Sequence, residues 1–152
     1  MAADLATVHA SAVLVGARAV LIRGPSASGK SRLALELLEA ARTGTLRFAR
    51  LVADDRVHLE AIGGRLLARP HEALAGLIEV RGFGLLRVTY EPRAVIGLVV
   101  DLDAPDAERL PAPDQRRTEI SGIVLPRLPF AKHSAGRPGV LALLNSTEDN
   151  WS

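Results

Sequence analysis

Gly24-Pro25-Ser26-Ala27-Ser28-Gly29-Lys30-Ser31 is the stretch that decides the fold, because it completes the phosphate-loop pattern G-x-x-x-x-G-K-[ST]. The apolar run Ala19-Val20-Leu21-Ile22 before it predicts a buried strand, and leucines at helical spacing after it predict a helix. A glycine loop between a strand and a helix directs backbone N–H groups and the helix dipole at a phosphate. We therefore expect a nucleoside triphosphate site in which Lys30 reaches the β- and γ-phosphates and the Ser31 hydroxyl holds Mg²⁺.

Composition narrows the class of protein. The 152 residues are enough for one domain, 48% of them are hydrophobic, and only 3% are aromatic, so aliphatic side chains must build the core. The absence of cysteine excludes disulfides, thiolate metal sites and a cysteine nucleophile. The apolar runs are too short to span a bilayer and no secretory signal is present, so we expect a cytoplasmic protein without a membrane partner. Scattered arginines and few aromatics argue against a nucleic-acid groove.

The pattern along the chain predicts an α/β protein with more hairpins than a doubly wound nucleotide-binding fold carries. A helix is expected over 30–41, ended by Gly44, and a tight hairpin turn at Gly63-Gly64. A helical turn is expected within 70–76, a loop over 103–115, and a strand or a helix over 140–144. Strands are expected over 8–15, 19–22, 48–53, 57–62, 65–68, 94–100 and 121–125.

Two strand ends offer the carboxylate that phosphoryl transfer needs to hold the metal or to accept a proton. Asp54-Asp55 follows one apolar run, and Asp101 follows a longer and more apolar one. Pattern alone favours Asp101, whereas the position of Asp54-Asp55 directly after the loop helix favours that pair. Glu79, in an apolar stretch with two glycines, is either a functional carboxylate or an ion-pair partner of Arg81.

These motifs, in this order, resemble the catalytic domain of HPr kinase/phosphorylase. That family phosphorylates a serine of HPr, the small carrier protein of the sugar phosphotransferase system. The resemblance covers about residues 7 to 128. It is carried by Val8-His9, the loop Gly24 to Ser31, Leu51-Val52-Ala53-Asp54-Asp55-Arg56-Val57 and Ile78-Glu79-Val80-Arg81-Gly82-Phe83-Gly84.

The resemblance implies a compact mixed sheet with flanking helices, as in phosphoenolpyruvate carboxykinase-like P-loop kinases, over a single catalytic domain of residues 1–152. It also implies ATP and Mg²⁺ as cofactors, HPr as partner, and a homo-oligomer, since the family is hexameric. Asp55 would be the proton acceptor, supported by Asp54, and Asp101 becomes a mere strand-end residue. The other residues that the resemblance assigns are Lys30 for the transferring phosphate, Ser31 and Glu79 for Mg²⁺, His9 as the active-site histidine, and Arg109 as the catalytic arginine of a later loop.

The chain also departs from the family pattern. It starts almost at His9, which suggests a short form without the family's N-terminal domain. Arg32 stands where the family usually has glutamate, and the loop over 88–94 is shorter. The segment linked to dephosphorylation is barely recognisable in 132–139, so we expect kinase rather than phosphorylase activity. Two alternatives remain: a small-molecule kinase of the same fold, and a nucleotide-sensing module that transfers nothing.

Overall fold

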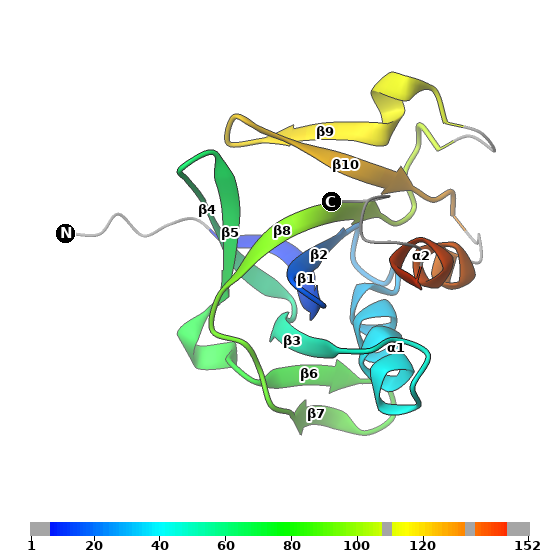
Figure 1. The fold of residues 1–152 in the computed structure, drawn as a ribbon. Coiled ribbons are helices and arrows are strands. Elements are labelled where there is room, and N and C mark those ends of the chain that lie inside the picture. Colours follow the sequence, from blue (N-terminus) through cyan, green and yellow to red (C-terminus); the bar gives the residue numbers. More distant parts are fainter. Residues whose placement is uncertain (1–6, 108–110, 133–135, 146–152) are drawn as a thin grey trace.

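The computed structural model describes residues 7–107, 111–132 and 136–145. Over these ranges the chain forms a mixed α/β fold in which helices cover one side of a curled sheet (Figure 1). The elements are β1 (Thr7–Val15), β2 (Arg18–Arg23), α1 (Lys30–Arg42), β3 (Ala49–Ala53), β4 (Arg56–Ile62), β5 (Arg65–Pro70), a 3₁₀ turn (Glu72–Leu74), β6 (Leu77–Val80), β7 (Gly84–Arg87), β8 (Ala94–Asp101), a second 3₁₀ turn (Pro113–Arg116), β9 (Arg117–Ile120), β10 (Ile123–Pro129) and α2 (Gly136–Asn145).

The strand β1 pairs with other strands along both of its edges. One edge of β1 pairs with β2, and the other edge pairs with β4 at the start of β1 and with β3 in its later part. Asp54 and Asp55 lie between β3 and β4, where this pairing is interrupted. The path β1–β4–β5–β8 returns to β1 through β2, which pairs in parallel with β8, so these strands close into a ring. The hairpin β9–β10 extends from β8, and the hairpin β6–β7 forms a separate sheet.

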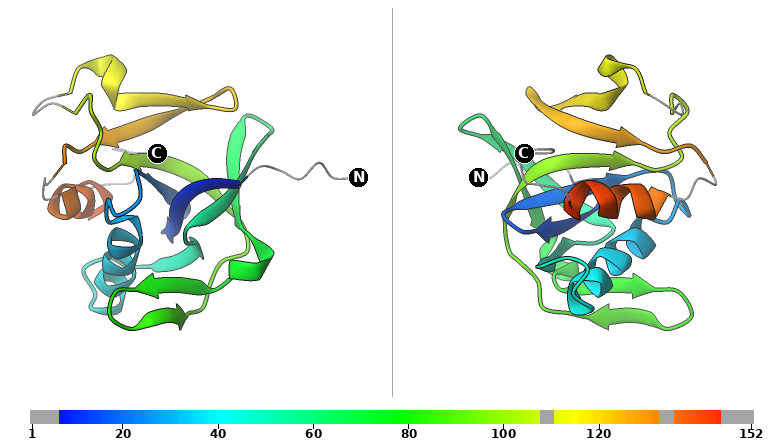
Figure 2. Two further views of the ribbon diagram at one scale, coloured as in Figure 1. Left: turned by 180° about the vertical axis from the view of Figure 1, so that it is seen from behind. Right: turned by 45° about the vertical axis from the view of Figure 1, so that its right-hand side comes forward.

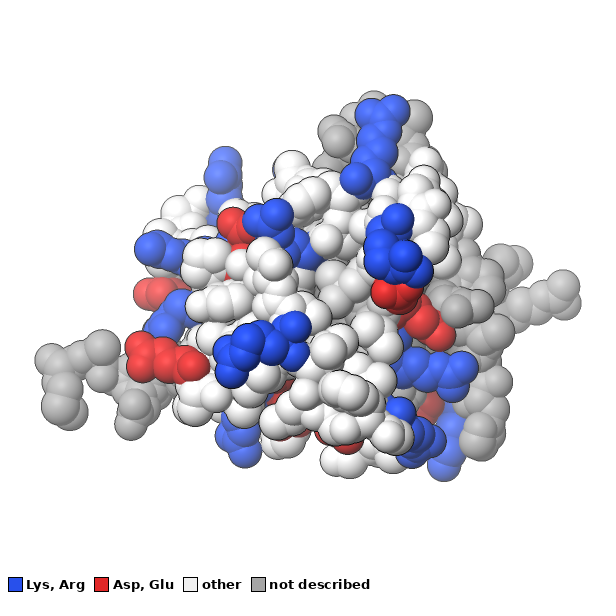
Figure 3. All heavy atoms as spheres, turned by 90° about the horizontal axis from the view of Figure 1, so that it is seen from below, with Lys and Arg blue, Asp and Glu red and all other residues white. Residues whose placement is uncertain are grey.

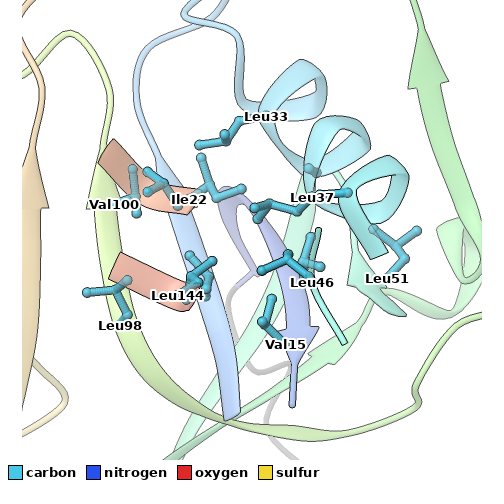
Figure 4. Packing of buried hydrophobic residues seen from close by; sticks show 14 of the residues in the cluster. Val15, Ile22, Leu33, Leu37, Leu46, Leu51, Leu98, Val100 and Leu144 are labelled. Carbon is cyan, nitrogen blue, oxygen red and sulfur yellow. The ribbon is translucent and has the colours of Figure 1, made fainter. Parts of the chain in front are cut away.

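The core has two parts because alternate residues of a strand face opposite sides. On the helix side, Ile22 of β2 meets Leu33 and Leu37 of α1 (Figure 4), and Val20 of β2 belongs to the same cluster. The helix α2 packs on the same side through Val140 and Leu144, and Figure 2 shows both helices from behind and from the side. The opposite side is filled by a second cluster that includes Ala10, Ala12, Leu21, Val52, Val57, Leu66 and Val99.

A bulge interrupts β8 at Gly97. In the pairing of β8 with β2, Ala19 lies opposite Ile96 and Val20 lies opposite Leu98. Gly97 therefore has no opposite residue of its own. Glycine inside a strand often marks such a bulge. Beyond it, Leu98 and Val100 join the helix-side cluster, and Val99 joins the opposite one.

Most of the expected elements are confirmed. The strand, phosphate loop and helix follow one another as predicted, Gly44 follows the helix end with φ 86°, and Gly63-Gly64 forms the turn between β4 and β5. The segment 140–144 is helical, which resolves the alternative left open there.

The bounds predicted for the strand over 121–125 were wrong. Ser121 and Gly122 are turn residues with φ 51° and 82°, β10 runs from Ile123 to Pro129, and β9 precedes the turn without having been predicted. The four residues of β9 carry two charges, and so short and polar a strand gives little hydrophobic alternation to detect.

Within the described residues, no helix is long and apolar enough to cross a membrane. Figure 3 shows the face of the molecule seen from below, where Lys and Arg side chains are interspersed with Asp and Glu side chains and with neutral surface. That face therefore carries no continuous basic stripe among its described residues.

Candidate active site

The phosphate loop has the backbone geometry of an anion cradle. Gly29, at φ 99°, precedes α1 in the left-handed conformation, and no side chain caps the helix in the described structure. The first backbone N–H groups of α1 therefore keep their donors for a ligand, and no acidic residue lies in its first turn. A Cβ on Gly24 would meet Ser28 Oγ at 2.5 Å and Leu102 O at 3.0 Å, so only glycine fits there.

Lys30 lies over the loop that it belongs to. Its ammonium donates to the carbonyl oxygens of Gly24 at 2.8 Å and Pro25 at 3.0 Å. Both bonds hold the positive charge at the mouth of the loop, where phosphate oxygens would arrive. Pro25, Ser26 and Ala27 are exposed, and the hydroxyl of Ser28 is buried without a hydrogen-bond partner in the described structure.

Asp54 is the buried centre of the site, with 4% of its surface exposed. Ser31 Oγ lies 2.8 Å and 2.9 Å from its two carboxylate oxygens. Ser11 Oγ donates to Oδ1 at 2.6 Å, and the backbone N–H of Glu79 donates to Oδ2 at 3.0 Å. Among the described residues no Lys, Arg or His pairs with this carboxyl group, so the groups that donate to its oxygens are all neutral.

Asp55, the next residue, is exposed instead. Its side chain keeps 58% of its surface, and the backbone has φ 68°, a left-handed conformation that aspartate adopts more readily than most residues. The Nδ1 atom of His9 lies 3.5 Å from Asp55 Oδ1, and the Ala10 N–H donates to the Asp55 carbonyl. The turn between β3 and β4 thus buries one carboxylate and presents the other to solvent.

Glu79 reaches the site through its backbone, at the end of β6. Its side chain is exposed, and within the described part of the chain no ion pair joins it to Arg81. No group of three or more His, Asp or Glu side chains is gathered as a metal cluster among those residues. A hydroxyl oxygen of Ser31 and a carboxylate of Glu79 would nevertheless suit Mg²⁺, which is usually bound through one or two carboxylates together with water and phosphate oxygens.

Asp101, the competing strand-end aspartate, is already neutralised by arginines. Arg23 binds both of its carboxylate oxygens, at 2.7 Å and 2.8 Å, and Arg127 binds Oδ2. Burial raises the pKa of Asp101, but the hydrogen bonds and charges of Arg23 and Arg127 outweigh burial and hold that pKa below its ordinary value. Arg127 also forms two bonds to Asp106, at 2.8 Å and 2.9 Å. Asp101 is therefore a structural anion.

The structure brings Lys30, Ser31, Asp54, Asp55 and His9, which the family resemblance assigns to the active site, to one end of β1, β2 and β3, with Glu79 beside them. Arg109 lies outside the described residues. Sequence reasoning missed Ser11, a single hydroxyl in the otherwise apolar run Ala10 to Val15. Its position two residues after His9 on the same strand was the available signal.

Known proteins resemble this chain in sequence and in fold. The family model described as the HPr serine kinase C-terminal domain matches residues 1–129. The chain belongs to that family. An HPr kinase/phosphorylase of Xylella fastidiosa is 37% identical over 128 residues, which cover 79% of this chain and 38% of the relative. One of Clostridium beijerinckii is 41% identical over 81 residues, 53% of this chain and 24% of the relative.

A solved structure matches a larger share of this chain than these relatives do. A solved structure described as the Hpr(Ser) kinase/phosphatase from Coxiella burnetii superposes with a TM-score of 0.71 at 25% identity, covering 95% of each chain. The curated relatives are longer, because the matched segments make up only 24% to 38% of their length. The family and the mixed α/β fold are thereby established.

Proposed function

We propose that this chain is an ATP- and Mg²⁺-dependent serine kinase acting on an HPr-type phosphocarrier protein. One arrangement carries the proposal: Ser31, the last residue of the phosphate loop, donates to the buried Asp54, and Asp55 exposes its carboxylate beside it. A phosphate cradle, a metal-binding hydroxyl and an accessible proton acceptor are the parts that phosphoryl transfer requires. Family membership supports the same substrate class.

In the proposed reaction Asp55 accepts the hydroxyl proton of the substrate serine while the serine oxygen bonds to the γ-phosphorus of ATP. The bond from that phosphorus to the β–γ bridging oxygen breaks, and ADP leaves. Lys30 exchanges its bonds to Gly24 and Pro25 for bonds to phosphate oxygens, which neutralises charge on the transferring group. Ser31 and Glu79 would hold Mg²⁺, which neutralises the phosphates when bound. His9 would orient Asp55, and Arg109 would bind the transferring group.

The resemblance to the HPr kinase family also supports proposals about the fold, location, partners and oligomeric state of the chain. Residues 1–152 would act as a single catalytic domain on a P-loop fold of the phosphoenolpyruvate carboxykinase type. The chain would work in the cytoplasm, with its carrier protein and ATP rather than nucleic acid as partners. Light scattering of the purified chain checks the homo-oligomer that the family resemblance implies.

Incubation with purified HPr, ATP and Mg²⁺, followed by mass spectrometry of intact HPr, tests the proposal. We expect one added phosphoryl group on a serine. Lys30→Ala should abolish transfer and keep the fold, and Arg65→Ala, which removes an exposed cation at the turn between β4 and β5, is the control. Wild-type turnover by Lys30→Ala would overturn the assigned role of the loop.

The two alternatives give different results in this assay. A nucleotide sensor would bind ATP tightly and phosphorylate neither HPr nor a metabolite. A small-molecule kinase would leave HPr unmodified and consume ATP with a metabolite pool.

A further inference from the structure

We infer that Ser11 is a positioning residue whose buried hydroxyl fixes Asp54, and through Asp54 the Ser31 hydroxyl, for the Mg²⁺-bound nucleotide. The inference rests on the proposed function, because it assigns Ser31 to the metal. It adds a residue that does not itself touch nucleotide, metal or substrate. Three observations carry it: the burial of Ser11, the sharing of the Asp54 oxygens, and the position of Ser11 on β1.

Ser11 has no exposed surface, and it is one of three buried polar residues in the described part of the chain, with Asp54 and Asp101. A buried hydroxyl without a partner costs free energy, so its presence in a core strand calls for a specific bond. That bond is the 2.6 Å contact with Asp54 Oδ1, which is short because the acceptor is a carboxylate.

Different groups among the described residues donate to the two carboxylate oxygens of Asp54. The Glu79 N–H holds Oδ2, Ser11 holds Oδ1, and the Ser31 hydroxyl lies between them at 2.9 Å and 2.8 Å. A hydroxyl has one proton and two lone pairs, so a Ser31 that donates to Asp54 turns a lone pair outward, toward a metal. Ser11 and the Glu79 N–H therefore fix the carboxylate, and the carboxylate fixes the direction of that lone pair.

Without the Ser11 hydroxyl, Oδ1 would keep only Ser31 as a protein donor among these groups. The carboxylate could then rotate about its Cβ–Cγ bond. The direction in which the Ser31 hydroxyl donates its proton would change with that rotation. Ser31 would remain in place on α1, since the helix does not depend on Ser11. The expected defect is therefore weaker Mg²⁺ binding, with the phosphate loop itself intact.

The face of β1 explains how this contact arises. His9, Ser11, Val13 and Val15 are alternate residues, and Val13 and Val15 belong to the helix-side core. His9 lies beside Asp55 and Ser11 beside Asp54, so this face of β1 changes from core to active site at Ser11. The same strand therefore aligns both aspartates, one through each polar residue.

Calorimetric titration with ADP, in the presence and absence of Mg²⁺, tests the inference. Ser11→Ala should weaken ADP binding roughly tenfold when Mg²⁺ is present, as is typical for groups that orient metal ligands. ADP binding without Mg²⁺ should be unchanged. In the kinase assay the Mg²⁺ concentration for half-maximal rate should rise, and the rate at saturating Mg²⁺ should approach that of the wild type.

Ser11→Thr, which keeps the hydroxyl, should restore the Mg²⁺ dependence, a rescue that lost packing would not produce. Val13→Ala on the same face is the matched control: it should lower the melting temperature and leave the Mg²⁺ dependence unchanged. If Ser11→Ala does not fold, Ser11→Cys keeps the side chain's shape with only a weak S–H donor and takes its place.

An unchanged Mg²⁺ dependence in folded Ser11→Ala would overturn the inference and leave the proposed function standing. Equal loss of ADP binding with and without Mg²⁺ would do the same, because it would indicate a damaged loop. If wild-type binding does not respond to Mg²⁺ at all, the proposed metal site falls, and this inference falls with it.

Discussion

Asp54 and Asp101 both follow buried strands, and both are largely buried, with 4% and 9% of their surface exposed. They differ in what neutralises them. Asp101 is bound by the guanidinium groups of Arg23 and Arg127, whereas Asp54 receives only hydroxyl and N–H donors among the described residues. A carboxylate paired with two cations offers little to a metal, and one held by neutral donors still attracts a cation. We therefore expect the chemistry at the end of β3 rather than at Asp101.

The largest effect is expected at the exposed member of the aspartate pair. Asp55→Asn should lower phospho-HPr formation about 10²–10⁴-fold, the range typical of general-base catalysis, while ATP binding stays near wild type. Asp54→Asn should also be damaging, with a smaller loss, because its role is support. Single-turnover kinetics together with nucleotide titration measures both. A larger loss for Asp54→Asn than for Asp55→Asn would exchange the two roles.

Asp101→Asn should act on stability and spare transfer. Removing the charge leaves Arg23 and Arg127 partly buried and underpaired, at a cost of roughly 3 kcal/mol of unfolding free energy, the low end for a buried pair. Denaturant unfolding measures this cost, and Asp114→Asn, an exposed aspartate, is the control that should change little. The rate per folded molecule should stay within about twofold. A folded but inactive Asp101→Asn would instead make Asp101 the metal-binding aspartate.

Glu79→Gln should produce the next smaller effect, a roughly tenfold higher Mg²⁺ requirement for transfer. Glutamine keeps the size but loses the charge that a hard cation prefers. The Glu79 N–H bond to Asp54 is a backbone bond and should survive the change. Titrating Mg²⁺ in the kinase assay measures the shift. If added Mg²⁺ restores nothing and nucleotide binding is unchanged, the Glu79 carboxylate has no part in the metal site.

The smallest effect is the pH dependence of the Asp101 pair. Because the folded pKa of Asp101 is lowered, its contribution to stability is complete above the unfolded value of about 3.9 and is lost as pH falls through the folded pKa. The gap in unfolding free energy between wild type and Asp101→Asn should therefore be constant near neutral pH and shrink below about pH 4. A gap that stays constant down to pH 2 would contradict the ion pairing.

The strand, loop and helix around Gly24 to Ser31 could be predicted from sequence because the pattern is local. The choice between Asp54 and Asp101 could not be made from pattern alone. Asp101 is preceded by the better apolar run, but its partners Arg23 and Arg127 are 78 and 26 residues away in the chain. Ser11 and Asp54 are separated by 43 residues. Contacts of this range depend on strand pairing, which single-sequence patterns do not specify.

The family resemblance favours the aspartate pair, and the binding of Asp101 by Arg23 and Arg127 supports the same choice. β9 was missed because its sequence is too short and polar to stand out. The roles of Lys30, Ser31, Asp55, Glu79 and His9 in catalysis remain predictions, which the experiments above address.

The bulge at Gly97 has a consequence for which aspartate meets the phosphates. Side chains alternate along a strand, so threading Gly97 as an ordinary strand residue would reverse every side chain after it. Leu98 and Val100 would leave the helix-side core, and Asp101 would turn from its arginines toward α1. Because the bulge takes up one residue, the Asp101 carboxylate stays with its arginines and does not turn toward α1, where Asp54 binds Ser31. A relative lacking that glycine would need no bulge and would keep Asp101 facing its arginines, so a one-residue difference in length at this point is compatible with the same active site.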